Sequence, residues 1–523
     1  MQIKKTILLI AALASLVACN SNNAKQGSMS SKPASTSIID DDVIKADCPV
    51  VAVTGGNIQG YYSDDNELRI YKGIPYAICE RFKAPVDAHW EGVKNCKEFG
   101  DSCIQNKIDD TPGGVYTSEF MGSIKSYSED CLNINVWTKN DDVPNKPVIL
   151  YIHGGANLAG NGSCKVYEGT GVARKDVVFV NINYRLGMFG WYSSDELIAE
   201  DPHAAGNYGL LDQIKALEWV RDNIHVFNGD KDNVMIVGQS AGAGGVNNLV
   251  ISPRAKGLFK RAMPMSHNST TSSNFKFLTT QEKADAFKSW IKEKVPNAPT
   301  KLEDLRKLSA NDFYSTFKSI WTPQSSYGHV YGPNIDGEVL TGYYVDIVAS
   351  GQANDVDYII GACRNDSRVD IEGIDDLEES HSGQSCLGAY SHSVGKYQGK
   401  TWVYLFAHVM PGKSTSMGVF HTSDVPYFLN VLTHKRDKYW TEEDRKLADT
   451  MCTYLTNFAK SGNPNGEGLV EWKNTDSTVG NINWDYMRLD VECEFKTLSV
   501  SSQNAIKNHY SELIVRIDEK AAL

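Results

Sequence analysis

The stretch from Val234 to Gly242 constrains this chain more than any other. It reads Val-Met-Ile-Val-Gly-Gln-Ser-Ala-Gly, and its four leading apolar residues predict a buried strand. A Gly-x-Ser-x-Gly pentapeptide follows at once, and the small and apolar residues over 243–250 can begin a helix. Strand, tight turn and helix form the setting in which a serine hydroxyl is presented on a strained corner. We therefore predict that Ser240 is a nucleophile.

Similar apolar runs indicate the rest of the fold. The runs at 146–152 and 177–183 are typical of parallel strands buried on both faces. Between them and Ser240, apolar residues at helical spacing predict a helix over 210–224. This alternation predicts an α/β fold with a large, mostly parallel central sheet and helices on both faces. Further strands are expected at 50–53, 58–62 and 68–74 as an antiparallel sheet edge, and at 356–362 and 401–407, with helices within 270–320 and at 448–460.

A serine hydroxyl is a weak nucleophile at neutral pH. It needs a base, usually histidine, and an acid that orients this base. In α/β-hydrolases the chain order is Ser, then Asp or Glu, then His, so both partners should follow residue 240. The amide of Ala241 points towards the same space as the Ser240 hydroxyl, which makes it one expected donor of an oxyanion hole.

From about residue 50 to 490 the chain resembles the type-B carboxylesterases, the family that includes the cholinesterases. Long motifs in the family's order carry the resemblance: 128–137 read Ser-Glu-Asp-Cys-Leu-Asn-Ile-Asn-Val-Trp, and 206–213 read Gly-Asn-Tyr-Gly-Leu-Leu-Asp-Gln. The resemblance implies an α/β-hydrolase fold. It also implies hydrolysis of a small-molecule carboxylic ester through an acyl-enzyme, with no metal and no organic cofactor.

The resemblance places the acid and the base. The family's acid lies one loop beyond a strand, in a pattern like Gly-x-x-x-(Asp/Asn)-Glu-Gly, and Asp366 occupies that position here. Asp370 and Glu372 stay open as alternative acids. The family's histidine opens a segment like His-Gly-x-(Asp/Glu)-(Ile/Leu)-Pro-Tyr, and His421 is its counterpart, followed by Thr422 where the family has glycine. We expect His421 to act first as the general base and then as the proton donor to the leaving alcohol.

The resemblance also places the second part of the oxyanion hole. Residues 153–156 read His-Gly-Gly-Ala directly after a predicted strand, so the amides of Gly155 and Ala156 are expected to join that of Ala241. Losing one such donor typically costs about 2.7–4 kcal/mol of transition-state stabilisation. Asn157 stands where the family has an aromatic residue, which predicts a more polar acyl-side pocket.

Further features implied by the family are structural. A disulfide between Cys103 and Cys131 would close a loop over the active-site gorge. In choline-hydrolysing relatives this loop carries a tryptophan that holds the quaternary ammonium, and residues 104–130 contain none, which argues against a choline ester. Scaffold ion pairs are expected between Arg81 and Glu129 and between Arg185 and Asp212.

The remaining cysteines are less informative. Of the eleven in the chain, ten remain if Cys19 is set aside, and an even number in an exported protein favours disulfides over metal ligation. No Cys-x-x-Cys or close Cys/His cluster suggests a metal site. The sequence leaves open the pairing of Cys48, Cys79, Cys96, Cys164, Cys363, Cys386, Cys452 and Cys493.

The N-terminal residues predict export and a lipid anchor. Lys4 and Lys5 precede an apolar run over 7–17 that is too short to span a bilayer as a mature helix. The run ends in Leu-Val-Ala-Cys, which resembles the lipobox of bacterial lipoproteins, so Cys19 is expected to be lipidated. An ordinary secretion signal is the alternative. Asn20, rather than Asp, favours the outer membrane of the cell envelope.

Three parts of the chain follow from these patterns. We predict a signal peptide over 1–18, a flexible tether over 19–47 and a single hydrolase domain over 48–523. The tether is rich in small polar residues and cannot bury enough apolar surface to fold alone. The net charge of −12 argues against a basic surface that would bind nucleic acid. The expected partners are therefore a small-molecule ester and, through the anchor, a membrane.

Two other functions stay open. A non-catalytic adhesion or binding module, like the neuroligins, would share the fold, but those relatives have lost the nucleophile, whereas Ser240, Asp366 and His421 are all present here. An amidase or a lipase would use the same three side chains on another bond.

Overall fold

The computed structural model describes residues 46–105, 124, 126–271, 277–322, 330–366, 369–432 and 439–523. Its strands are Val51–Val53 (β1), Gly56–Gln59 (β2), Tyr61–Tyr62 (β3), Leu68–Pro75 (β4), Val93–Asn95 (β5), Ser102–Cys103 (β6), Tyr127–Ser128 (β7), Asn133–Lys139 (β8), Lys146–Ile152 (β9), Val178–Ile182 (β10), Gly229–Gln239 (β11), Arg261–Met265 (β12), Asp357–Cys363 (β13), Thr401–Phe406 (β14), Asp485–Leu489 (β15) and Glu494–Thr497 (β16). Its α-helices are Thr170–Ala173 (α1), Gly187–Trp191 (α2), Asp195–Glu200 (α3), Tyr208–Asn223 (α4), Ala241–Ile251 (α5), Thr280–Lys294 (α6), Leu302–Lys307 (α7), Ala310–Phe317 (α8), Tyr344–Ala349 (α9), Leu377–Val394 (α10), Val425–Phe428 (α11), Glu442–Ser461 (α12), Val500–His509 (α13) and Ser511–Ala521 (α14).

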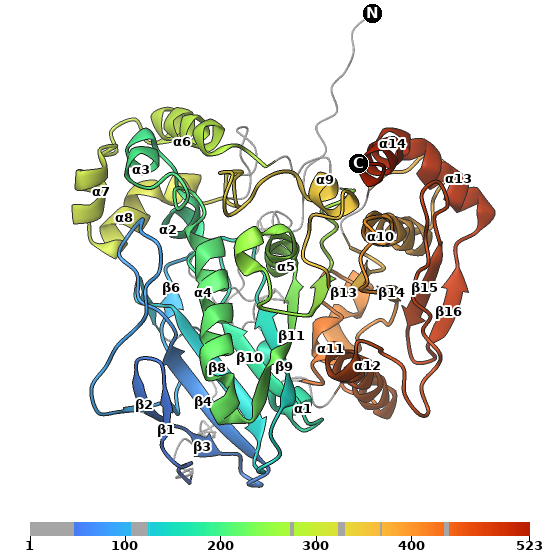
Figure 1. Ribbon diagram of the computed structural model, residues 1–523, viewed down its shortest axis with the longest axis horizontal. Helices are drawn as coiled ribbons and strands as arrows, with labels where there is room; N and C mark the ends of the chain where they lie inside the picture. The colour runs from blue at the N-terminus through green and yellow to red at the C-terminus, as the bar shows by residue number, and fades with distance from the viewer. Residues whose placement is uncertain are drawn as a thin grey trace, which may run out of the picture.

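One large sheet runs through the molecule, with helices on both sides of it (Figure 1). Its strand order is β16-β15-β14-β13-β12-β11-β9-β10-β8-β4-β3. The strands from β15 to β10 in that order are parallel, and antiparallel pairs lie at both edges. The predicted α/β-hydrolase architecture is therefore confirmed.

The central strands bury both of their faces. In β9, Val148 and Leu150 belong to one hydrophobic cluster, whereas Ile149 and Tyr151 belong to the other. Because side chains alternate along a strand, a continuous apolar run places residues in both clusters. In the sheet β9 separates β10 from β11, so the strand order reverses there. Ligands of open α/β sheets bind beyond the carboxyl ends of strands at such a reversal.

The predicted antiparallel edge is partly wrong. The residues of β3 and β4 do join the large sheet, as expected. However, β2 pairs with both β1 and β5 in a separate three-stranded sheet. The chain turns tightly at Gly55 and Gly56, where φ is 103° and 155°, and a Cβ at either position would lie against the ring of Trp90. Trp90 also bonds to this hairpin, since its amide donates to the Gly55 carbonyl and its Nε1 to the Asn57 carbonyl, each at 2.9 Å.

Several elements that the sequence pattern did not indicate lie in the C-terminal half. Helix α10 is buried along nearly all of its length despite seven serine and histidine residues, so it lacks an amphipathic period. Helix α12 begins well before the predicted residue 448, because Thr441 and Asp444 form a capping box. Among the described residues, no helix is long and apolar enough to cross a membrane.

A charged network joins α12 to the ends of two strands. His408, just beyond β14, lies 2.9 Å from Asp444 and 3.0 Å from Asp490, which follows β15. Burial alone would lower the pKa of His408, but its hydrogen bonds to both carboxylates outweigh burial and raise this pKa to about 9. Tyr427 in α11 donates to Asp444 at 2.7 Å, so the network also reaches the segment that follows His421.

This network predicts a pH-dependent stability. Since the pKa of His408 rises from 6.5 to about 9 on folding, its stabilising contribution is complete below pH 6.5 and is lost as the pH rises through about 9. Thermal unfolding of wild type and His408→Gln should therefore differ most below pH 6.5 and converge above pH 9. A difference between the two proteins that is constant across this range would contradict the assignment.

Candidate active site

Ser240 occupies the turn between β11 and α5. Its φ is 57° and its ψ is −124°, a region that residues with a side chain rarely adopt. The turn is held from both sides, because the Ser240 amide donates to Met265 of β12 at 2.9 Å and the Ser240 carbonyl accepts from Gly244 at 3.0 Å. This strained backbone is the geometry of a nucleophile elbow, as predicted from the pentapeptide.

The two glycines of the pentapeptide permit a close approach of backbones. A Cβ at Gly238 would lie 2.4 Å from the Gly242 carbonyl oxygen. A Cβ at Gly242 would lie 2.1 Å from the Ile152 carbonyl oxygen, at the end of β9. Helix α5 can therefore start directly above the sheet only because neither position carries a side chain.

The segment that follows β9 lies beside the serine. A Cβ at Gly154 would be 3.0 Å from the Cβ of Ser240. Gly155, Ala156 and Asn157 all have positive φ, at 111°, 56° and 58°, so the chain turns sharply here. The structure thus brings the predicted oxyanion segment to Ser240. The convergence of the Gly155, Ala156 and Ala241 amides on one oxygen remains a prediction.

The side chain of Asn157 supports this turn. Its Nδ2 donates to the Tyr331 carbonyl at 3.0 Å, and its Oδ1 accepts from the Tyr184 hydroxyl at 3.3 Å. Its carbonyl accepts from the Gly187 amide at 2.7 Å. Asn157 is therefore hydrogen-bonded to the scaffold, and its expected effect on the polarity of the acyl-side pocket remains a prediction.

His421 and Asp366 are brought together from separate loops. His421 Nδ1 lies 2.9 Å from each oxygen of Asp366, which follows β13. The alternative acids, Asp370 and Glu372, are exposed. Burial alone would lower the pKa of His421, but the charge and the hydrogen bond of Asp366 raise it above its ordinary value. A neutral imidazole in this position would donate its Nδ1 proton to Asp366.

Hydrogen bonds between the loop that carries Asp366 and the loop that carries His421 hold this pair together. Asn365 donates its amide to the Val419 carbonyl at 2.9 Å, and its Oδ1 accepts from the Val419 amide at 2.8 Å. Gly418 has a φ of 65°, and a Cβ there would lie 2.6 Å from Asn365 Oδ1. Sequence reasoning did not single out Asn365, although the family's acid pattern carries Asp or Asn at this place.

The other nitrogen of His421 faces Gln239. The Nε2 atoms of the two side chains are 3.1 Å apart, and among the described residues no hydrogen bond joins Ser240 Oγ to His421. Hydrogen bonds of catalytic groups are often long before substrate binds. Sequence reasoning missed Gln239, although it lies inside the pentapeptide.

A second carboxyl group is buried near the pair. Asp424 accepts from the Tyr404 hydroxyl at 2.9 Å. Burial, with the nearby charge of Asp366, raises the pKa of Asp424 to about 6. By contrast, His153 is uncharged at neutral pH because burial lowers its pKa to about 4, and its ring stacks on Tyr184 with centroids 4.5 Å apart.

The predicted disulfide is present and supports the oxyanion segment. Cys103 and Cys131 are joined, and Gln105 forms a two-way clamp with Gly160: its Nε2 donates to the Gly160 carbonyl at 2.9 Å, and its Oε1 accepts from the Gly160 amide at 2.8 Å. A Cβ at Gly160 would lie 2.4 Å from the Gly154 carbonyl oxygen and 2.5 Å from His153 Nδ1, so the clamp restrains a residue that packs against the oxyanion segment. No sequence signal indicated Gln105.

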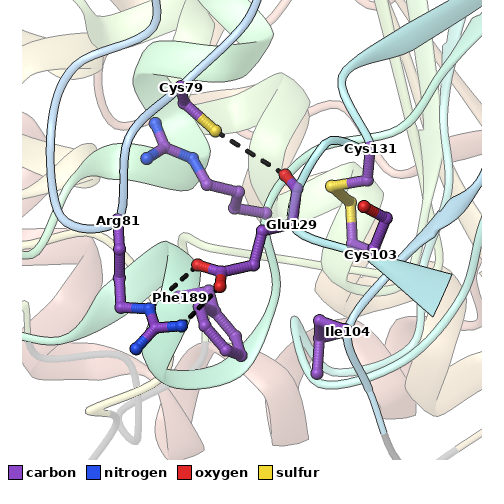
Figure 2. A pocket seen from close by; sticks show the side chains of 9 residues that line it. Cys79, Arg81, Cys103, Ile104, Glu129, Cys131 and Phe189 are labelled. Carbon is purple, nitrogen blue, oxygen red and sulfur yellow. Dashed lines mark hydrogen bonds and ion pairs between the residues drawn. A yellow bond between two sulfur atoms is a disulfide. The ribbon is translucent and has the colours of Figure 1, made fainter. Parts of the chain in front are cut away.

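Figure 2 shows the surroundings of this disulfide, with Arg81 and Glu129 beside it. Arg185 lines the same small cavity. Arg81 binds Glu129 through two nitrogens, and Arg185 binds Asp212 at 2.7 and 2.8 Å. The cavity here is about 10 Å³, room for one water at most. Cys103–Cys131 is the one disulfide among the described residues, and six of the other eight cysteines outside the N-terminal segment are buried. The expectation of further disulfides is therefore wrong.

The fold, the elbow and the loop-borne histidine and acid define an α/β-hydrolase with a serine-centred site. The sequence profile of the carboxylesterase family matches residues 47–386 and 386–504, so the chain belongs to this family. It is a serine-type carboxylic-ester hydrolase, as predicted.

Individual relatives agree with this classification. The chain is 28% identical to para-nitrobenzyl esterase of Bacillus subtilis, over 81% of this chain and 92% of that protein. It matches a crystal structure of Geobacillus stearothermophilus carboxylesterase EST55 with a TM-score of 0.69 and 26% identity, covering 87% of this chain and 99% of the other. Mouse neuroligin-2 is 26% identical over 80% of this chain, which covers 61% of neuroligin-2.

The backbone strain at Thr422 can be tested by its effect on the stability of the protein. It stands where the family has glycine, and its φ of 85° is rare for a β-branched residue. Its Oγ1 is buried without a hydrogen-bond partner in the described part of the chain. Thr422→Gly should therefore raise the free energy of unfolding by about 1 kcal/mol in urea denaturation. Thr422→Ala, which keeps the Cβ, should gain much less, and a destabilised glycine variant would contradict the strain.

Proposed function

We propose that Ser240, His421 and Asp366 catalyse ester hydrolysis as a triad. The observation that carries this proposal is that His421 contacts Asp366 through Nδ1 at 2.9 Å and, through Nε2 at 3.1 Å, Gln239, the residue directly before Ser240. Three segments far apart in the sequence meet at this point, after β11, β13 and β14. Asp366 would hold the imidazole with its proton on Nδ1, so that the lone pair of Nε2 could accept the serine proton.

The reaction follows from these roles. Ser240 Oγ attacks the ester carbonyl while His421 Nε2 takes its proton, and a tetrahedral intermediate forms. The amides of Gly155, Ala156 and Ala241 would bind its oxyanion, supported by the closeness of the 153–157 turn to Ser240. The proton then passes from His421 to the departing alcohol. Water, activated by His421 in turn, releases the acid and restores Ser240.

The substrate class is proposed as small carboxylic esters. The same three side chains would also serve to cleave an amide or a long-chain lipid ester, but the similarity to para-nitrobenzyl esterase favours a small ester. The argument against choline esters rests on residues 104–130, of which only 104, 105, 124 and 126–130 lie within the described residues.

The triad is tested by turnover of short-chain p-nitrophenyl esters. Ser240→Ala should lower kcat by on the order of 10⁶-fold, because the nucleophile and its base act as one unit. Circular dichroism should show an unchanged fold. A variant that hydrolyses the ester at the wild-type rate would disprove the role of Ser240.

We also propose that the mature chain is anchored by lipid at Cys19 in a bacterial cell envelope, on the outer membrane. The support is the sequence alone: a basic start, an apolar run over 7–17 and the Leu-Val-Ala-Cys box. A diacylglyceryl group adds two chains, enough for stable anchoring, and residues 20–47 would serve as a tether.

The anchor is tested by mass spectrometry of the mature N-terminus from the native host. The expected N-terminal peptide begins at Cys19 and carries the added mass of the lipid. Cys19→Ser should leave the protein in the soluble fraction after cell lysis. An unmodified peptide that begins at another residue would refute lipidation.

A further inference from the structure

Lys283 places its amine in a fully buried site. It lies near the start of α6, and none of its surface is exposed to solvent. Lysine is almost never fully buried unless its amine is paired. Its three partners are all uncharged oxygens: Nζ donates to the Gly206 carbonyl at 2.7 Å, to Asn334 Oδ1 at 3.2 Å and to the Gly332 carbonyl. These three acceptors match the three N–H groups of an ammonium.

The oxygens around this amine come from two other parts of the fold. Gly206 directly precedes the N-cap of α4, whereas Gly332 and Asn334 belong to the segment over 330–336. A Cβ at Gly206, where φ is 78°, would lie 2.3 Å from Asn334 Oδ1 and 3.2 Å from Nζ, so the site has no spare room. Burial lowers the pKa of the Lys283 amine well below its ordinary value, and donation to these oxygens works against that shift.

The segment over 330–336 is also fixed on the side away from the active site. The Asn334 amide donates to Asn207 Oδ1 at 2.9 Å, and Asn207 Nδ2 donates to the Asn334 carbonyl at 3.1 Å. The Thr280 amide, at the start of α6, donates to the Ile335 carbonyl at 3.2 Å. The segment is thus bonded to the starts of α4 and α6, and Lys283 adds a bond further along it, at Gly332.

The same segment contacts the turn expected to bind the oxyanion. Asn157 Nδ2 donates to the Tyr331 carbonyl at 3.0 Å, and a Cβ at Gly332 would lie 3.9 Å from the same nitrogen. Asn157 directly follows Ala156, whose amide is an expected oxyanion donor. Consecutive carbonyls therefore have different partners: that of Tyr331 accepts from the turn, and that of Gly332 accepts from the amine.

We propose that Lys283 is a positioning residue for ester hydrolysis, which sets the oxyanion turn through Gly332 and Tyr331. The proposal rests on the triad and the oxyanion hole proposed above. Only the two soft backbone dihedrals of Gly332 separate the two carbonyl groups, so a shift at the amine is passed to Asn157. A displacement of about 1 Å in such a turn can lower the rate by about 100-fold.

The experiment compares wild type with Lys283→Met, which keeps an apolar stem and removes the donors. We expect kcat/KM for p-nitrophenyl acetate to fall by about 10–100-fold. The inhibition constant of 1,1,1-trifluorobutan-2-one should rise by the same factor, because both quantities report stabilisation of the oxyanion formed on Ser240. A purely structural lysine would lower the melting temperature and leave the inhibition constant unchanged, since this constant does not depend on how much of the protein is folded. That result would overturn the proposal.

A second variant tests the other end of the connection. Asn157→Gly tolerates the left-handed backbone at this position, where φ is 58°, and removes the bond to Tyr331. Its inhibition constant should also rise, and a wild-type value would overturn the proposal even if Lys283→Met does not fold. Because both residues act through one contact, the double variant should be no weaker than Asn157→Gly alone. Effects that add would contradict this connection.

Lys146→Met is the matched control. Lys146 is also buried and lies 2.8 Å from Asp141, but it begins β9, at the end of the strand opposite the oxyanion turn. Its loss should lower the melting temperature and leave the inhibition constant at the wild-type value. An equal rise in the inhibition constant there would show a general effect of losing a buried lysine and would overturn the proposal.

The outcomes distinguish this inference from the triad. If Ser240→Ala still turns over the ester, the triad itself fails. If Ser240→Ala is inactive and Lys283→Met binds the trifluoromethyl ketone as tightly as wild type, only the role of Lys283 fails.

Discussion

The turn at Ser240 depends on contacts between backbones that no side chain could tolerate. Gly242 lies so close to the end of β9 that a Cβ would meet the Ile152 carbonyl oxygen at 2.1 Å, and Gly238 lies equally close to the start of α5. These approaches fix the strained backbone of Ser240 and also bring the turn after β9 beside it. One packing constraint therefore positions both the nucleophile and the segment expected to bind the oxyanion.

The remaining parts of the site are held by amide side chains. Asn365 hydrogen-bonds the loop of Asp366 to the loop of His421. Gln105 forms two hydrogen bonds with Gly160, which packs against the oxyanion turn, and Asn157 hydrogen-bonds that turn to Tyr331. Each can donate and accept without adding charge. Charge is thus confined to few positions near the imidazole. This contrasts with the His408 network, where two carboxylates hold a cation that stabilises the fold.

The sequence predicted the fold and the principal site residues because both depend on local patterns. Continuous apolar runs indicated β9, β10 and β11, and the pentapeptide indicated the strained turn. The likeness to a family then indicated Asp366 and His421, which no local pattern connects. The pairing of β2 with β1 and β5 was not foreseen, since strand partners depend on distant contacts such as Trp90. Gln105, Gln239 and Asn365 were missed because an amide's role depends on its neighbours in space.

The central claim is that Ser240, the imidazole of His421 and the amides of two turns converge on one reacting carbon. A crystal structure of the enzyme after inactivation by a phosphonate ester tests it most directly. We predict a covalent bond from Ser240 Oγ to phosphorus, with the phosphonyl oxygen in hydrogen-bond contact with the amides of Gly155, Ala156 and Ala241, and His421 beside Oγ. An adduct on another residue, or an oxygen turned away from those amides, would contradict it.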